Sequence, residues 1–305
     1  MSKTIRIGTR DSQLALWQAT TVQKQLEDLG YKTTLEAVKS TGDLVLDKPL
    51  YEMGITGIFT KTLDVAMLNG SIDIAVHSMK DVPTALPNGI VQTAVLKRAS
   101  ATDILVTKKK EVDFSKPCTI ATGSLRRKAQ WLHRYPHHTV VNLRGNVNTR
   151  LQKLEDNDWD GAIFAKAGLE RIDILPEHTI ALDWMIPAPA QGAMVIVALE
   201  NDTFSIAATQ KLNHTHTEIT TRLERDFLRT MEGGCTAPIG AFAEVVSNAI
   251  DFKAGLFSLD GQEKIEVLKA VKLEDIEEAL GSTWADEVRA RGGKELMDAI
   301  KSNMG

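Results

Sequence analysis

The sequence predicts an α/β fold in which two similar α/β lobes are followed by a small α+β C-terminal domain. Short apolar strand-like runs alternate with amphipathic helical segments along the first two thirds of the chain. The order of strand, polar turn and helix near the N-terminus recurs after residue 118, as a second copy of the same unit would. From His214 onward, one helix is followed by three strands and two further helices.

The composition is that of a globular protein with two or three domains. The chain has 305 residues, 43% of them hydrophobic and 25% charged, and its formal net charge of −4 argues against a nucleic-acid partner. No apolar run is long enough to span a membrane, and residue 1 leads straight into a strand without a signal peptide. Cys118 and Cys235 lie far apart, so neither a disulfide framework nor a zinc ribbon is indicated. We expect a cytoplasmic protein without a metal.

The first lobe opens with an anion-binding arrangement. Asp11 or Ser12 can cap the helix that begins at Gln13, and the free N–H groups at this end attract anions, as does Arg10 beside them. The expected elements are strands over residues 3–8 and 31–38 and helices over residues 13–29 and 59–68. Residues 40–58 have no clear period and several glycines, which predicts a mobile lid over a cleft.

The stretch from Ser71 to Pro83 is central to the functional prediction. It begins as a short buried strand and ends in polar residues, so Lys80 and Asp81 would lie beyond the carboxyl end of the strand, where ligands bind in such sheets. A carboxylate beside an ammonium group stays ionised and can hold or move a proton on a cationic intermediate. The alternative is a surface ion pair without a function.

The second copy of the unit is rich in arginine. We expect a strand over residues 118–122, helices over residues 125–133 and from Thr149, and a strand near residue 161. Arg126 and Arg127 fall in the first turn of a helix, where the helix dipole disfavours cations, so a bound anion is expected to offset the cost. A solvated basic helix face is the alternative. Two such lobes imply a cleft between them as the binding site.

The remaining segments indicate a hinge and a separate last domain. Residues 186–192, IPAPAQG, predict a crossing back to the first lobe. The last domain is expected to hold a helix ending at Gly233, strands over residues 241–246, 251–259 and 264–271, and helices over residues 273–280 and 282–303. His214 and His216 show no third metal ligand. Cys235 has no neighbouring base, so on its own it is better explained as a structural thiol.

Seven ordered segments, taken together, resemble the porphobilinogen deaminase (hydroxymethylbilane synthase) family over residues 5–240. They are IGTRDSQLALWQA, FTKTLD, DIAVHSMKDVP, ATGSLRRKAQ, NLRGNVNTRLQKL, PAPAQGAM and LERDFLRTMEGGCTAPIG. The resemblance implies two lobes with the type II topology of periplasmic binding proteins and a C-terminal domain with a cofactor cysteine. It also implies a transferase of tetrapyrrole biosynthesis that joins four porphobilinogen molecules head to tail, releases ammonia at each step and yields hydroxymethylbilane by hydrolysis.

The resemblance further implies which residues form the site. The cofactor would be one dipyrromethane, joined by a thioether to Cys235, because the electrophile that forms it is reactive enough for an unactivated thiol. Asp81 would be the catalytic carboxylate. The other cofactor-binding residues would be Lys80, Asp81, Arg126, Arg127, Ser124, Arg144 and Gly145, and the substrate-binding residues would be Arg10, Ser12, Lys61, Arg144, Arg150, Arg171 and Gln191.

The resemblance also implies three domains and a monomeric protein. Domain 1 would comprise residues 1–98 and 190–212, domain 2 residues 99–189, and domain 3 residues 213–305. The alternative from another class is a two-lobed binding protein that captures an organic polyanion without chemistry. Asp81 argues against it, since a carboxylate opposes an anionic ligand.

Overall fold

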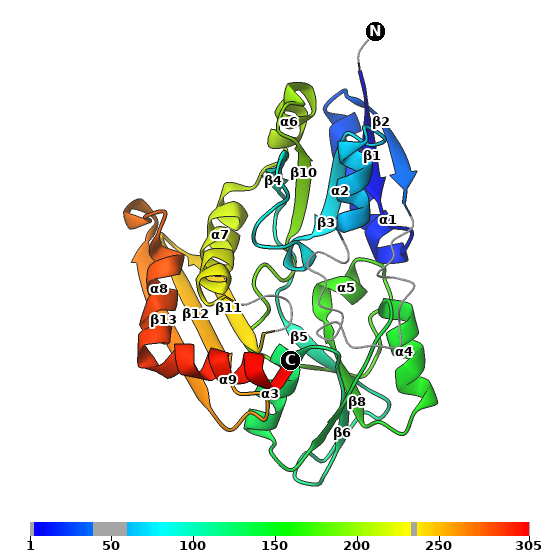
Figure 1. Cartoon of the computed structure of the whole chain (residues 1–305). Coiled ribbons are helices and arrows are strands. Elements are labelled where there is room, and N and C mark those ends of the chain that lie inside the picture. The colour runs from blue at the N-terminus through cyan, green and yellow to red at the C-terminus, as the bar shows by residue number, and fades with distance from the viewer. Residues whose placement is uncertain (1–2, 39–59, 233–236, 305) are drawn as a thin grey trace.

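The structure is a computed structural model that describes residues 3–38, 60–232 and 237–304. These residues form three sheets, each with its own helices (Figure 1). The first sheet and its helices are called lobe 1 here, the second sheet and its helices lobe 2, and the third sheet and its helices the C-terminal domain. The predicted lid and Cys235 lie outside the described residues.

Lobe 1 is a mixed sheet with the strand order β2-β1-β3-β10-β4, in which β10 runs antiparallel to both of its neighbours. Its elements are β1 (Thr4–Thr9), α1 (Gln13–Asp28), β2 (Lys32–Ala37), α2 (Lys61–Leu68), β3 (Ile74–Ser78), the 3-10 turn η3 (Met79–Asp81), β4 (Ile90–Val95), β10 (Met194–Leu199) and α6 (Thr203–Gln210).

Both faces of this sheet are buried, and successive side chains of β3 pack on opposite faces. Ile74 and Val76 of β3 pack with α1, whereas Ala75 between them packs on the opposite face with Leu63 and Met67 of α2. Because successive strand residues point to opposite faces, a nearly continuous apolar run is what a sheet covered on both sides requires. The covered faces hold β3 rigidly, and with it the turn that follows.

Lobe 2 repeats this arrangement, with the strand order β7-β6-β8-β5-β9 and β5 as the antiparallel strand. Its elements are β5 (Asp103–Thr107), β6 (Thr119–Ala121), α3 (Leu125–Arg134), β7 (Thr139–Val141), α4 (Val147–Asp156), β8 (Gly161–Ala165), α5 (Lys166–Glu170) and β9 (Thr179–Ala181). The matching strand orders confirm the prediction of two similar α/β lobes. The expected start of a helix at Thr149 was two residues late, because Asn146 caps the helix by accepting a hydrogen bond from Thr149 N at 2.9 Å.

Two segments connect the lobes, residues 96–102 and residues 182–193, and they touch each other at Gly192. Gly192 has a φ of +84°, and a Cβ atom there would lie 2.6 Å from the carbonyl oxygen of Ser100. Only glycine fits this crossing, since a side chain would collide with backbone and adopt a disfavoured conformation. The PAPAQG segment is thus a crossing between the lobes, as predicted.

The C-terminal domain is an antiparallel sheet, β11-β12-β13, covered by helices. Its elements are α7 (Thr215–Thr230), β11 (Ile239–Val246), β12 (Ala249–Phe257), β13 (Lys264–Lys272), the 3-10 turn η4 (Leu273–Asp275), α8 (Leu280–Val288), the turn η5 (Arg289–Gly293) and α9 (Lys294–Met304). Two helix predictions were wrong here. Residues 273–280 form only a short 3-10 turn before α8, and the expected helix over residues 282–303 is interrupted at Gly292, whose φ is +96°.

The C-terminal domain contacts the segments that connect the lobes. α7 lies between the third sheet and lobe 1 (Figure 1). Its fully buried Glu224 accepts hydrogen bonds from Ala190 N at 2.6 Å and Ala243 N at 2.7 Å, and it forms an ion pair with Arg98 at 2.5 Å. Arg98 also donates to the carbonyl oxygen of Gln191 at 2.8 Å. A buried charge held by this many donors fixes α7 against both crossing segments.

Candidate active site

The turn after β3 carries the two residues that the sequence placed at the centre of the site. β3 ends at Ser78, and η3 follows at once, closed by a hydrogen bond from Val82 N to the carbonyl oxygen of Met79 at 3.2 Å. Lys80 and Asp81 are both half-buried at this carboxyl end of the strand. They therefore lie where an open α/β sheet binds ligands.

Lys80 is bound to the crossing segment between the lobes. Its Nζ donates to Gln191 Oε1 at 3.2 Å. The pKa of Lys80 is lowered to about 8, chiefly by desolvation and also by the nearby charge of Arg127, whereas Asp81 and Asp103 act in the opposite direction. The ammonium group is thus more readily deprotonated than that of a solvated lysine.

A buried carboxylate organises the arginine pair of lobe 2. Asp103, the first residue of β5, is fully buried and accepts a hydrogen bond from Arg126 Nη1 at 2.7 Å. Arg127 donates to the same carboxylate from Nε at 3.0 Å and from Nη2 at 2.8 Å, and Gln191 Nε2 donates at 2.8 Å. Burial alone would raise the pKa of Asp103, but the charges of Arg126 and Arg127 more than offset it, so the pKa lies well below its usual value.

A second group of cations lies within electrostatic reach of this cluster. Arg150 Nε donates to the carbonyl oxygen of Gly145 at 2.7 Å, and the pKa of Arg150 is lowered to about 10, chiefly by burial. The charges of Arg127 and Arg144 contribute to this lowering and Asp81 opposes it, so these side chains lie within electrostatic reach of Arg150. Among the residues that the structure describes, the cations of this region outnumber its carboxylates.

Two buried guanidinium nitrogen atoms mark where an anion is needed. Arg126 Nε and Arg144 Nη1 are buried and have no hydrogen-bond partner within the described residues. An unpaired buried donor on a charged group costs free energy, and a carboxylate ligand would satisfy it.

The amino end of α1 forms a small cavity of about 60 Å³ with the end of β3 and the turn η3. Arg10, Ser12, Gln18 and Asp81 line it. Ser12 caps α1 by accepting a hydrogen bond from Ala15 N at 3.4 Å, which is one of the two caps that the sequence analysis named. The structure therefore brings Arg10 and Ser12 beside Asp81, although they are about seventy residues apart in the chain.

Most of the other predicted site residues contact the crossing segments or the amino end of α3. Gln191 is fully buried between Lys80 and Asp103, and Arg171 donates to the carbonyl oxygen of Gly192 at 2.7 Å. Ser124 caps α3 by accepting from Arg127 N at 3.4 Å. The side chain of Lys61, at the start of α2, is exposed. The structure thus groups all of these residues except Lys61 around the crossing segments and the amino end of α3.

Two family models together match most of the chain. Residues 5–207 match the family model described as porphobilinogen deaminase, dipyromethane cofactor binding domain, and residues 219–290 match the porphobilinogen deaminase C-terminal domain. A porphobilinogen deaminase of Chloroherpeton thalassium is 39% identical over 313 residues, with 99% of each chain covered. One of Desulforamulus reducens is 41% identical over 315 residues, again with 99% of each covered.

The chain belongs to the porphobilinogen deaminase family. Membership confirms the predicted resemblance, the predicted transferase activity of hydroxymethylbilane synthase type and the predicted dipyrromethane cofactor. Among solved structures, a second substrate binding domain of a putative amino acid ABC transporter from Streptococcus pneumoniae aligns at 9% identity, with a TM-score of 0.44, covering 68% of this chain and 91% of the other. The periplasmic VFT2 domain of Bordetella pertussis BvgS aligns at 12% identity and a TM-score of 0.39, covering 68% and 86%.

The carboxylate at the centre of the arginine cluster was not predicted from the sequence. A bound anion was expected to offset the cost of Arg126 and Arg127 at a helix start, and Asp103 of the chain itself already lies against both guanidinium groups. The sequence signal for this carboxylate is weak: an acidic residue begins the otherwise apolar run DILV. A strand that is buried on both faces accommodates an acidic residue only if the charge has a partner.

His214 and His216, the histidines considered as metal ligands, lie at the start of α7. His214 caps α7, with its Nδ1 accepting from Thr217 N at 3.2 Å. No group of three or more histidine, cysteine or acidic side chains in the described part of the chain could hold a metal ion. Within the same residues, no helix is long and apolar enough to cross a membrane.

Proposed function

We propose that the chain joins four porphobilinogen molecules head to tail on a dipyrromethane primer bound to Cys235, with Asp81 as the catalytic carboxylate. The observation that carries this assignment is the position of Asp81. It is a carboxylate at a strand end, facing the cavity with Arg10, in a region where cations otherwise predominate. Such a site attracts the substrate's acetate and propionate groups and still offers one negative charge to a cation.

Asp81 would act when ammonia leaves the substrate. The carbon–nitrogen bond of the aminomethyl group breaks, and the electron pair leaves with the nitrogen, so positive charge develops on the pyrrole. A fixed carboxylate stabilises that charge and accepts a hydrogen bond from the pyrrole N–H. It can also take the proton that is released when the next pyrrole carbon has formed its bond.

The arginines would hold the carboxylates of cofactor and substrate. When bound, dipyrromethane supplies the pyrrole carbon to which the first substrate is joined. The residues present fit it, because Arg126 Nε and Arg144 Nη1 have no hydrogen-bond partner in the described part of the chain, and the region carries an excess of positive charge. We assign Lys80, Arg126, Arg127, Ser124, Arg144 and Gly145 to the cofactor, and Arg10, Ser12, Lys61, Arg144, Arg150, Arg171 and Gln191 to the substrate.

We further propose three domains: domain 1 comprises residues 1–98 and 190–212, domain 2 residues 99–189, and domain 3 residues 213–305. We also propose that the enzyme is a cytoplasmic monomer that needs neither nucleic acid nor membrane. The lobe boundaries are supported by β10 and β5, each of which begins directly after a crossing segment.

The test combines two measurements on the purified chain. Ammonia release on addition of porphobilinogen separates the enzyme from a binding protein that only captures an organic acid. The intact mass of the denatured chain should exceed the sequence mass by one dipyrromethane. Cys235→Ser should lose this thioether-linked mass, whereas Cys118→Ser should keep it, since Cys118 is buried in lobe 2. An active wild-type chain with its bare sequence mass would overturn the role of Cys235.

A further inference from the structure

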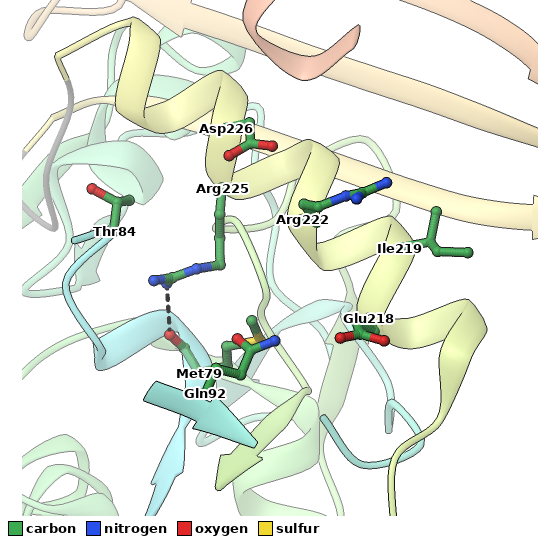
Figure 2. A pocket seen from close by; sticks show the side chains of 8 residues that line it. All are labelled: Met79, Thr84, Gln92, Glu218, Ile219, Arg222, Arg225 and Asp226. Atoms are coloured by element: carbon green, nitrogen blue, oxygen red, sulfur yellow. Dashed lines mark hydrogen bonds between the residues drawn. The ribbon is translucent and has the colours of Figure 1, made fainter. Parts of the chain in front are cut away.

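The guanidinium group of Arg225 reaches from α7 to the catalytic turn of lobe 1. Arg225 Nη1 donates to the carbonyl oxygen of Val82 at 2.9 Å and to that of Met79 at 3.2 Å, and Nη2 donates to the carbonyl oxygen of Pro83 at 2.6 Å. Figure 2 shows the bond to Met79 and the direction of the side chain. These acceptors lie on both sides of Lys80 and Asp81 in the chain.

A planar guanidinium group is suited to this task. Its donors point in fixed directions, so bonds to three carbonyl oxygen atoms define both the position and the orientation of the turn. A lysine ammonium group has no such planar arrangement and cannot reproduce it.

Packing on this side of the turn is incomplete. A cavity of about 280 Å³ lies beside Arg225, with walls from lobe 1 and from α7 (Figure 2). Its lining residues are Met79, Thr84, Gln92, Glu218, Ile219, Arg222, Arg225 and Asp226. Side chains do not fill this space, so the hydrogen bonds from Arg225 join the turn to α7 beside a cavity.

The helix that carries Arg225 is itself fixed. The preceding residue, Glu224, is fully buried and bound to Ala190 N, Ala243 N and Arg98. α7 ends at Thr230, five residues before Cys235 in the chain. One rigid helix therefore contacts the catalytic turn and leads into the segment that carries the cofactor cysteine.

We propose that Arg225 is a positioning residue that acts through the Met79–Pro83 turn to hold Asp81 in place relative to α7. The inference rests on the proposed catalytic role of Asp81. It implies that loss of the guanidinium group lowers the turnover rate of loaded enzyme, because a carboxylate displaced by about 1 Å can lose on the order of 100-fold in rate.

The experiment compares Arg225→Met, Arg225→Lys and Arg222→Met in the cofactor-loaded enzyme, with turnover expressed per loaded chain. Arg222 is the matched control, because it lies one turn earlier on α7 and lines the same cavity but makes no hydrogen bond to the described residues 79–83. We expect kcat to fall roughly 10-fold to 100-fold in Arg225→Met with little change in KM, to fall less in Arg225→Lys, and to stay at the wild-type value in Arg222→Met.

A double variant shows whether Arg225 acts through Asp81. If it does, the double variant Asp81→Asn with Arg225→Met is no slower than Asp81→Asn alone. The carboxylate that Arg225 positions is already absent in both, so its displacement has no further effect on the rate. Wild-type kcat in Arg225→Met, or losses in the double variant that multiply, would overturn the inference. A lower loaded fraction or Tm with normal kcat per loaded chain would do the same, since it indicates a merely structural contact. If Asp81→Asn is itself fully active, the proposed role of Asp81 fails instead.

Discussion

The two lobes share one strand order and differ in where they place a carboxylate. The last residue of β3, Ser78, is paired with Met194, the first residue of the antiparallel strand β10. The equivalent pair in lobe 2 is Ala165 of β8 and Asp103 of β5. Lobe 1 thus has an apolar residue in its antiparallel strand and its acidic residue, Asp81, in the following turn. In lobe 2 the acidic residue, Asp103, lies in the antiparallel strand, and the turn after β8 has no acidic residue at the equivalent positions.

This difference separates two tasks within one architecture. Asp103 is fully buried and neutralised by Arg126 and Arg127, so its charge serves to orient those arginines. Asp81 is half-buried and lines a cavity, so its charge is available to a ligand. Counted from the end of β8, the positions that correspond to Lys80 and Asp81 hold Ala167 and Gly168. Of these two equivalent turns, the one in lobe 1 therefore carries a candidate catalytic carboxylate and the one in lobe 2 does not.

The largest expected effect is on stability and comes from Asp103→Asn. Removing this charge leaves two buried guanidinium groups without their anion, and breaking a buried ion pair from one side costs about 3–5 kcal/mol. Urea unfolding of the cofactor-free protein should show this loss. Asp113→Asn is the control, because Asp113 pairs with Lys116 at the surface, and its loss should change stability little. Equal effects in the two variants would show that Asp103 is not the organising charge of lobe 2.

The same residue gives a pH dependence with a definite sign. The folded-state pKa of Asp103 is lowered, so the unfolded chain binds its proton first as the pH falls. The stabilisation is therefore present above the unfolded pKa of about 3.9 and is lost progressively as the pH drops towards the folded pKa. Wild-type unfolding should become easier below about pH 4, with a shallower acid slope in Asp103→Asn.

The next effect is on rate and comes from Asp81→Asn. The asparagine keeps the shape of the side chain and removes the charge, so the cation formed as ammonia leaves loses its partner. Removal of such a preorganised group costs about 10²–10³ in kcat. Ammonia release per loaded chain should fall by this amount while urea unfolding changes little. Turnover near the wild-type level would remove the distinction between the two carboxylates.

Much of this arrangement could be predicted from local sequence. The caps at Ser12 and Ser124, the strand that ends before Lys80 and the crossing near Gln191 all follow from residues that are neighbours in the chain. The pairing of Asp103 with Arg126 and Arg127 could not be predicted in this way. It depends on which strand lies beside which and in what register, over more than twenty residues of separation.

Arg225 shows the same limit more strongly. Its carbonyl acceptors are more than 140 residues away in the chain, and neither hydropathy nor a helix signal connects them. Polar residues on α7 recur at the spacing of a helix with one solvent-exposed face. From this pattern alone, Arg225 could equally be exposed. Only the docking of α7 against lobe 1 shows that this side chain contacts the turn that carries Asp81.

A moderate effect is expected at Lys80. The pKa of Lys80 is lowered to about 8, so the group is charged below that pH and increasingly neutral above it. A neutral amine binds carboxylates less well, so the rate at which cofactor-free protein acquires dipyrromethane from porphobilinogen should fall as the pH rises through 8. Lys80→Arg should remove this fall, since arginine stays charged. A profile that is the same in both proteins would assign the titration to another group.

The smallest expected effect is at Lys166, the first residue after the strand end in lobe 2 that corresponds to the end of β3. Lys166 is half-buried, with a side chain 40% exposed, and it pairs with Glu170, four residues along the chain, at 3.4 Å. A solvent-accessible pair at this spacing is worth only about 0.3–0.5 kcal/mol, so Lys166→Ala should leave kcat, KM and cofactor loading at wild-type values and change Tm only slightly. A tenfold loss of activity in Lys166→Ala would mean that both strand ends contribute charge to the substrate. The division of tasks between the lobes would then have to be abandoned.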